Sequence, residues 1–235
     1  MPGIRAELTF VGTATTVIRL GEFTLLTDPN FLHKGQRSYL GRGLWSRRLT
    51  EPAMGPGDLP ELDAILLSHL HGDHFDRIAK RDLSHATPVI TTPHAARRLR
   101  RYEFETVGLQ PWATHKMRRA DEELTISATP AVHARGVMGR LLPPVMGSLL
   151  EHRVNGVLRQ RLHISGDTLT GPHVDEIAHR FDDIDTAVCI PPLPFLSTTT
   201  TTGCSNPRSR TSWRLPVAFV RRFLSTSFGV ATRSR

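Results

Sequence analysis

The sequence predicts a single α/β domain, built in layers, with a functional site along one edge of its sheets. Three observations predict this fold. Short apolar runs separated by turn glycines open the chain, as in a β-meander. Further strand-like runs are interleaved with helix-like segments. Several of these runs end in His or Asp, and polar groups gathered at strand ends are typical of a ligand site.

The chain begins with a predicted antiparallel meander. Runs that alternate at period two, or are continuously apolar, predict strands at residues 6–11, 15–20 and 23–28. Gly12 and Gly21 supply the turn signals between them.

A long irregular stretch, residues 29–60, follows the meander and is rich in Gly, Pro and Arg. Loops of this length often face a substrate. The part from Phe31 to Met54 contains Trp45 and the pair Arg47-Arg48, and together with the Leu-, Met- and Pro-rich residues 134–147 it could line an apolar groove. Local packing of the two loops is the alternative.

The remainder of the chain alternates between strands and helices. A buried strand at residues 64–67 leads through a polar turn into a short helix from Asp76. Residues 88–92 and 94–101 are predicted as strand and helix. Later strands are predicted at residues 112–117, 123–133, 147–154, 158–167 and 186–190, with a helix at 173–180.

Four potential metal ligands follow the strand at residues 64–67: His69, His71, Asp73 and His74. In extended backbone, His69 and His71 point to the same side, and a turn through Gly72 can bring the other two to a second point. Imidazole and carboxylate suit zinc, iron or manganese, and two such ions about 3.5 to 4 Å apart can share a water. A His-rich surface turn is the alternative, but we favour a binuclear site because this pattern seldom arises by chance.

Two later residues extend the constellation. His133 ends the strand-like stretch at residues 123–133, and Asp167 ends the one at residues 158–167. Either residue alone would more often be structural, as a capped strand end or a hydrogen-bonded core histidine. Beside the first cluster, both become candidate ligands.

A family resemblance rests on five segments in order: FVGTATTVIRL, LLTDP, SHLHGDHFD, TPAVHARG and ISGDT. The chain resembles the metallo-β-lactamase superfamily, and within it the L-ascorbate-6-phosphate lactonase-like and N-acyl-phosphatidylethanolamine phospholipase D-like branch. The resemblance covers about residues 6–192. It implies a four-layer αβ/βα sandwich with a binuclear metal site between the two sheets.

The resemblance also implies a role for each ligand. The implied ligands are His69, His71 and His133 for the first metal, Asp73 and His74 for the second, and Asp167 as the bridge. Asp28, in the LTDP turn, would support these ligands through hydrogen bonds. Asp73 would in addition pass a proton between the nucleophile and the leaving group, as the one catalytic acid-base residue.

The implied activity is that of a metal-dependent hydrolase with two Zn²⁺ ions, or Mn²⁺ or Fe²⁺ in their place. A metal-bound hydroxide would cleave an ester, lactone or phosphodiester. An apolar groove would favour a lipid-like rather than a small polar substrate. Two alternatives stay open: a catalytically impaired, truncated family member that binds metal weakly, and a metallo-nuclease, whose extra nucleic-acid-clamping domain 235 residues hardly accommodate.

The end of the chain departs from the family pattern. Members usually supply one more histidine from a C-terminal strand, but no histidine follows His179, and residues 193–235 form a Thr-, Ser- and Arg-rich stretch without acids. We therefore predict a metallo-β-lactamase-fold domain at residues 1–192, incomplete at its C-terminal end. Residues 193–235 are predicted to be a disordered tail or the product of a reading-frame shift near Pro192, which sequencing of the coding DNA would decide.

The net charge of +8 does not predict a specific nucleic-acid partner, because residues 1–185 carry only 23 basic and 22 acidic side chains. Basic segments at residues 94–101 and 116–119 could meet phosphate, RNA or an anionic membrane, although a solvated face is the more common role of such runs. Neither a transmembrane segment nor a signal peptide is predicted. We expect a cytoplasmic protein that acts on a small-molecule or lipid-like substrate, with peripheral membrane contact left open, and the sequence does not predict its oligomeric state.

Overall fold

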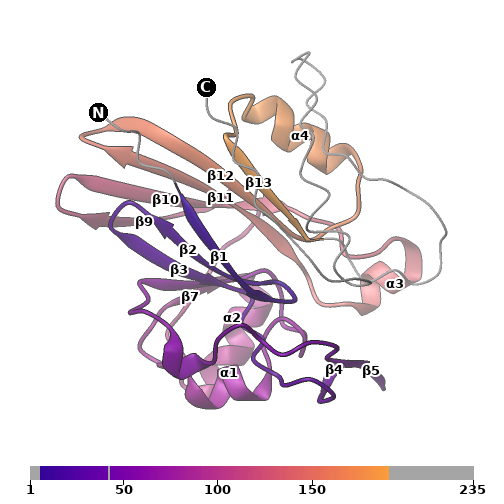
Figure 1. The fold of residues 1–235 in the computed structure, drawn as a ribbon. Coiled ribbons are helices and arrows are strands. Elements are labelled where there is room, and N and C mark those ends of the chain that lie inside the picture. Colours follow the sequence, from indigo (N-terminus) through magenta and orange to yellow (C-terminus); the bar gives the residue numbers. More distant parts are fainter. Residues whose placement is uncertain (1–5, 42, 191–235) are drawn as a thin grey trace.

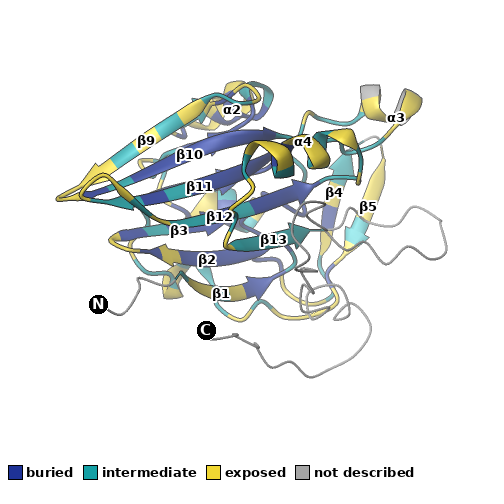
Figure 2. Ribbon diagram, turned by 90° about the horizontal axis from the view of Figure 1, so that it is seen from above, coloured by how far each residue is buried: buried dark blue, intermediate teal, exposed yellow. Residues whose placement is uncertain are grey.

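Two β-sheets packed face to face form the body of the protein in the computed structural model, which describes residues 6–41 and 43–190 (Figure 1). Helices α1 (Arg77–Asp82) and α2 (Pro93–Leu99) lie outside the first sheet, and α4 (Pro172–Arg180) lies outside the second. The view from above shows α4 lying across the strands of the second sheet (Figure 2). The predicted four-layer sandwich is therefore the observed architecture, whereas the predicted tail at residues 193–235 lies outside the described residues.

The first sheet comes entirely from the N-terminal half of the chain and has six strands in the order β1-β2-β3-β6-β7-β8. These strands are β1 (Glu7–Gly12), β2 (Thr15–Leu20), β3 (Phe23–Thr27), β6 (Ala64–Leu67), β7 (Val89–Thr91) and β8 (Thr106–Gly108). The first three form the predicted antiparallel meander. β3, β6, β7 and β8 run parallel, so their carboxyl ends share one edge of the sheet.

The second sheet comes from the C-terminal half and has five strands in the order β13-β12-β11-β10-β9. These strands are β9 (Thr114–Arg119), β10 (Glu122–Pro130), β11 (Met146–Val154), β12 (Val157–Asp167) and β13 (Thr186–Ile190). The first four are antiparallel, and β13 joins β12 in parallel after the crossover through α4. All five strands match runs predicted from the sequence.

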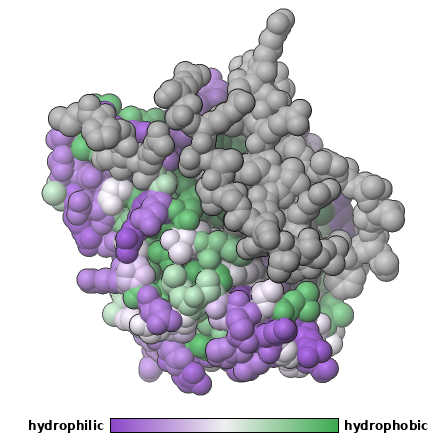
Figure 3. All heavy atoms as spheres, viewed as in Figure 1, coloured by the Kyte–Doolittle hydropathy of each residue, from purple (hydrophilic) through white to green (hydrophobic). Residues whose placement is uncertain are grey.

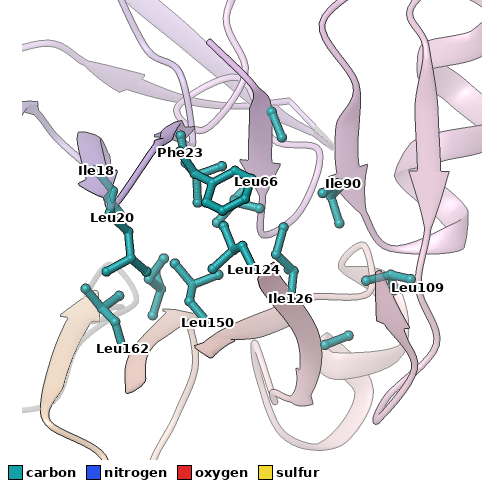
Figure 4. Packing of buried hydrophobic residues seen from close by; sticks show 14 of the residues in the cluster. Ile18, Leu20, Phe23, Leu66, Ile90, Leu109, Leu124, Ile126, Leu150 and Leu162 are labelled. Carbon is teal, nitrogen blue, oxygen red and sulfur yellow. The ribbon is translucent and has the colours of Figure 1, made fainter. Parts of the chain in front are cut away.

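Alternating side chains on the strands divide the core into two layers. In β6, Ala64 and Leu66 face the second sheet, whereas Ile65 and Leu67 pack toward α1 and α2. Leu124 and Ile126 of β10 meet the inner face of the first sheet between the layers (Figure 4). A strand buried on both faces explains why residues 64–67 are continuously apolar.

Hydrogen bonds of Glu122, the first residue of β10, join the two sheets and form what we call the clamp. The carboxylate of Glu122 accepts from the backbone N–H of Glu22, in the β2–β3 turn, and lies 2.8 Å from Nε2 of the fully buried His152 on β11. Gly21 has a φ of +59°, and a Cβ there would lie 2.5 Å from His152 Nε2 and closer still to Glu122. Glycine is therefore required at this turn by conformation and by space.

Several short elements occur where the sequence predicted loops or nothing regular. The stretch at residues 29–60 contains a hairpin, β4 (Arg37–Gly41) and β5 (Leu44–Arg47), followed by a 3₁₀ turn at Pro56–Asp58. A second 3₁₀ turn covers Arg100–Tyr102. Helix α3 (Gly136–Leu141) lies within the loop that follows β10.

Candidate metal centre

The predicted ligands converge near the last residue of β10, Pro130, whereas the Glu122–His152 clamp lies at its first residue. His69, His71, Asp73 and His74 follow β6 directly, and backbone hydrogen bonds from His74 and Phe75 to the carbonyl of His71 fold this segment into a turn. The second sheet supplies the other two predicted ligands, since His133 follows β10 and Asp167 ends β12. The cluster therefore bridges the two sheets.

Two groups of potential ligand atoms share His69. His69, His71 and His133 form one group, and His69, His74 and Asp167 form the other, with all ligand atoms of each group within 4.8 Å of one another. His69 Nε2 lies 3.1 Å from His71 Nδ1. Ring nitrogens pack this closely when they point at a common centre, as ligands of one cation do.

Asp167 stands between the two groups. Its Oδ2 atom is 3.3 Å from His74 Nε2 and 3.8 Å from His133 Nε2. One carboxylate oxygen thus faces a histidine of each group, which is the position expected of the bridging ligand.

Asp28 and Ser68 hold the histidines from behind. Asp28 Oδ1 accepts hydrogen bonds from the backbone N–H and the hydroxyl of Ser68, at 2.7 and 3.0 Å. Its Oδ2 is 3.2 Å from His74 Nδ1, and Ser68 Oγ is 3.0 Å from His69 Nδ1. A carboxylate on Nδ1 orients the His74 ring so that Nε2 faces Asp167 and the other potential ligands, an arrangement common in metal sites.

The electrostatics of the cluster favour a bound cation. Burial, reinforced by neighbouring imidazoles, lowers the pKa of His71 to about 4 and lowers the pKa values of His69 and His133, so these rings are neutral and their lone pairs are available at neutral pH. Burial opposes the charged form of His74, but the carboxylates around it outweigh that effect and raise its pKa.

Asp73 provides a direct test of whether a metal ion fits. Burial raises the pKa of its carboxyl group, and its Oδ1 atom is buried with no hydrogen-bond partner in the part of the chain that the structure describes. A buried carboxylate oxygen without a partner is costly. Beside imidazole nitrogens, a divalent cation satisfies this oxygen, so the residues present fit the group.

The structure thus brings five of the six predicted ligands into the two groups, with Asp28 behind them. Asp73 belongs to neither group, although its carboxyl group interacts electrostatically with His74, Asp167 and His133. One local prediction was wrong: His133 does not end a strand, because β10 ends at Pro130 and His133 lies in the loop beyond it. Proline donates no hydrogen bond, so the sheet ladder stops there.

Sequence reasoning missed Ser68 and Asn30. Ser68 immediately precedes the first ligand at the strand end, and this adjacency was the available signal. Asn30 donates from its side chain to the backbone carbonyl of Asp73 at 2.9 Å. No signal in the sequence pointed to that contact, because 43 residues separate the two.

The predicted apolar groove between residues 31–54 and 134–147 stays a prediction. An open pocket of about 350 Å³ is lined by Phe31, Met54 and Ile78, with His33, Glu51 and other charged side chains at its rim. None of the predicted metal ligands lines this pocket. We therefore do not place the chemistry in it.

The family model for the beta-lactamase superfamily domain matches residues 24–190, which include every predicted ligand. The chain belongs to the metallo-β-lactamase superfamily. The fold and the donor set described above agree with that assignment. Within the described residues, no helix has the length and apolar character needed to cross a membrane.

Three known proteins are similar to the chain. The UPF0173 protein YddR of Bacillus subtilis is 25% identical over 179 residues, or 74% of this chain and 67% of that protein. The N-acyl-phosphatidylethanolamine-hydrolyzing phospholipase D 1 of Caenorhabditis elegans is 28% identical over 120 residues, but these are 51% of this chain and only 30% of the worm enzyme. The crystal structure of isothiocyanate hydrolase from Delia radicum gut bacteria shares the fold, with a TM-score of 0.61, 24% identity and coverage of 74% and 68% of the two chains.

Proposed function

We propose that this protein is a hydrolase with a binuclear metal centre that cleaves an ester, a lactone or a phosphodiester, with lipid-like molecules as its substrates. The observation that carries the proposal is the pair of ligand groups that share His69 and meet at Asp167. The name of the worm relative, a phospholipase D, supports the lipid-like substrate class. We propose Zn²⁺ in both sites, with Mn²⁺ or Fe²⁺ as alternatives, and a cytoplasmic location.

The proposed ligands divide as the family resemblance implies. The first set coincides with the first group, whereas Asp73 belongs to neither group. His69, His71 and His133 would hold the first ion; the second would be held by Asp73 and His74, with Asp167 shared. Bound there, the cations would lower the pKa of a water molecule toward neutrality and stabilise negative charge on the substrate.

The remaining chemistry belongs to the side chains themselves. Asp28 and Ser68 fix the orientation of the His74 and His69 rings, so that Nε2 of each faces the centre. Asp73, whose pKa burial raises, would carry a proton between the attacking water and the leaving group.

A second candidate function is that of an impaired family member with one weak site. The specific observation is that no histidine follows His179, so the second ion would depend on Asp73, His74 and the shared Asp167. Fewer ligands mean weaker binding of that ion.

The deciding experiment is metal content per chain of the purified protein, measured together with hydrolysis of bis(p-nitrophenyl) phosphate. About two metal ions per chain with chelator-sensitive turnover would support the hydrolase. The His71→Ala and Asp167→Asn variants should lose turnover, and Asp175→Asn, an exposed site on α4, should keep it. About one ion without turnover would support the impaired member, and an unchanged rate in His71→Ala would overturn the ligand assignment.

A further inference from the structure

The β4–β5 hairpin presents a built surface on one face. In its antiparallel register Arg37 pairs with Arg47, and Tyr39 pairs with Trp45. Directly paired residues, and residues two apart on one strand, share a face, so a basic pair and an aromatic pair lie on the same side of the ribbon. All four residues are exposed, Trp45 by 59% and Tyr39 by 48%.

The opposite face of the hairpin is fastened to the metal-binding segment. Ser38 is buried and donates from its hydroxyl to the carbonyl of Gly72 at 3.0 Å, and the N–H of Gly72 donates to the carbonyl of Tyr39 at 3.1 Å. A Cβ on Gly72 would lie 2.6 Å from that carbonyl oxygen. The hairpin therefore sits directly on the turn that carries His71 and Asp73.

The base of the hairpin is also held in place. Arg48 is buried and turns away from the exposed face, donating to the backbone carbonyl of Thr50 and to the side chain of Asn30. Asn30 in turn bonds to the carbonyl of Asp73. Hydrogen bonds therefore fix the backbone that carries the exposed aromatic rings.

The segment that contains the hairpin carries only positive charge. Residues 29–50 contain five Lys and Arg residues and no acidic residue. The basic segment at residues 116–119 differs, because Lys116 and Arg118 both pair with Glu123. Exposed Leu44 and Leu49 lie in the same segment as the aromatic pair. At the lower right of the space-filling view, where Figure 1 draws the hairpin, apolar and hydrophilic residues lie side by side (Figure 3).

We propose that the hairpin docks on an anionic lipid surface through the face formed by Arg37, Tyr39, Trp45 and Arg47, with the exposed side chains of Leu44 and Leu49 beside it. Tryptophan and tyrosine prefer the headgroup region of a bilayer, and leucine enters the acyl boundary beneath it. Arginine pairs with lipid phosphate in a bidentate manner. The hydrogen bonds to Gly72 would then hold the metal centre close to that surface.

Single-stranded nucleic acid is the other partner that basic and aromatic residues attract. Stacking of bases requires free ring faces, and the contact between the Tyr39 and Trp45 rings, tilted by 54° with centroids 4.9 Å apart, reduces the ring surface that a base could reach. Exposed leucines contribute nothing to stacking but gain from burial in lipid. The lipid surface therefore explains more of this face.

The test is sedimentation of the full chain with vesicles of phosphatidylcholine alone or of phosphatidylcholine mixed with phosphatidylglycerol. We expect binding to the mixed vesicles and little to the neutral ones. The Tyr39→Ser/Trp45→Ser and Arg37→Gln/Arg47→Gln variants should each lose about tenfold or more in partitioning. Tyr102→Ser and Arg97→Gln/Arg98→Gln, which remove an equally exposed tyrosine and an exposed arginine pair elsewhere, should bind as the parent does.

Three outcomes would overturn the proposal: no binding to the anionic vesicles, equal loss in the control variants, or binding of a single-stranded RNA oligonucleotide that the hairpin variants abolish while vesicles are ignored. Circular dichroism of each variant separates lost binding from lost folding. The proposal extends the lipid-like substrate proposed above, but its test is independent. Lost vesicle binding with normal metal content and turnover of bis(p-nitrophenyl) phosphate refutes docking alone, whereas vesicle binding without metal or turnover refutes the hydrolase alone.

Discussion

Replacing Gly21 with alanine should destabilise the protein far more than the same change at another left-handed glycine. Gly21 has a φ of +59°, and alanine in that conformation costs about 1 to 2 kcal/mol. The added Cβ would also collide with Glu122 and with His152 Nε2, which would be 2.5 Å away. The clamp must then open.

The structure sets the size of this second effect. Opening the clamp breaks the hydrogen bond from Glu22 to Glu122 and the contact of Glu122 with buried His152, both 2.8 Å. Hydrogen bonds to a charged group contribute about 1.5 to 3 kcal/mol each. Because the groups can partly relax, we expect Gly21→Ala to lower the free energy of unfolding by about 3 to 5 kcal/mol in total.

Gly156→Ala is the matched control. Gly156 has a φ of +76°, but a Cβ there would have no atom within 4 Å, so only the backbone penalty of about 1 to 2 kcal/mol remains. Urea unfolding, followed by circular dichroism, measures both variants against the parent. Losses that agree to within about 1 kcal/mol would refute the clamp as a stabilising device.

Three further predictions concern the metal centre and its surroundings. Asp28→Asn removes the acceptor at His74 Nδ1 and should weaken Zn²⁺ binding about 10- to 100-fold by calorimetric titration, whereas Asp175→Asn should leave it unchanged; equal affinities would contradict the role of Asp28. Zn²⁺ at about 100 times its dissociation constant should raise the free energy of unfolding by about 2.7 kcal/mol, and melting curves that coincide with and without a chelator would argue against a site that binds the native state. Burial lowers the pKa of His163 to about 4; the unfolded chain therefore takes up the proton first as the pH falls from about 6.5 to 4. His163 alone then lowers the stability by at most about 3 kcal/mol in that window, in addition to the losses from His69, His71 and His133. His163→Gln should flatten this slope, and an unchanged slope would show that His163 does not cause it.

The pattern of apolar residues predicted most of the two sheets because burial acts on each strand separately. Residues 64–67 are apolar at every position, and the structure buries them on both faces of β6. The order of strands across a sheet is not indicated by the residue pattern of any one strand. The parallel pairing of β3 with β6 joins segments separated by the whole stretch 29–60, so it depends on packing that no single segment contains.

The site was predictable where ligands are adjacent in the sequence and less so where tertiary contacts supply the partners. His69, His71, Asp73 and His74 lie within six residues. Ser68 contributes by donating hydrogen bonds to Asp28, which is forty residues away in the sequence. The hairpin escaped prediction because Gly41, Gly43 and several arginines interrupt its short alternation.

Each sheet is built from one uninterrupted half of the chain, and this division has a consequence for assembly. Strands β1 to β8 end at Gly108, and β9 begins at Thr114, so a cut between them would yield two fragments, each with one complete sheet. The proposed ligands are shared between those fragments, with His69 on one side and Asp167 on the other. A bound cation would therefore link the two fragments. When the fragments are expressed separately and mixed, the amount of reassembled protein should increase with the zinc concentration.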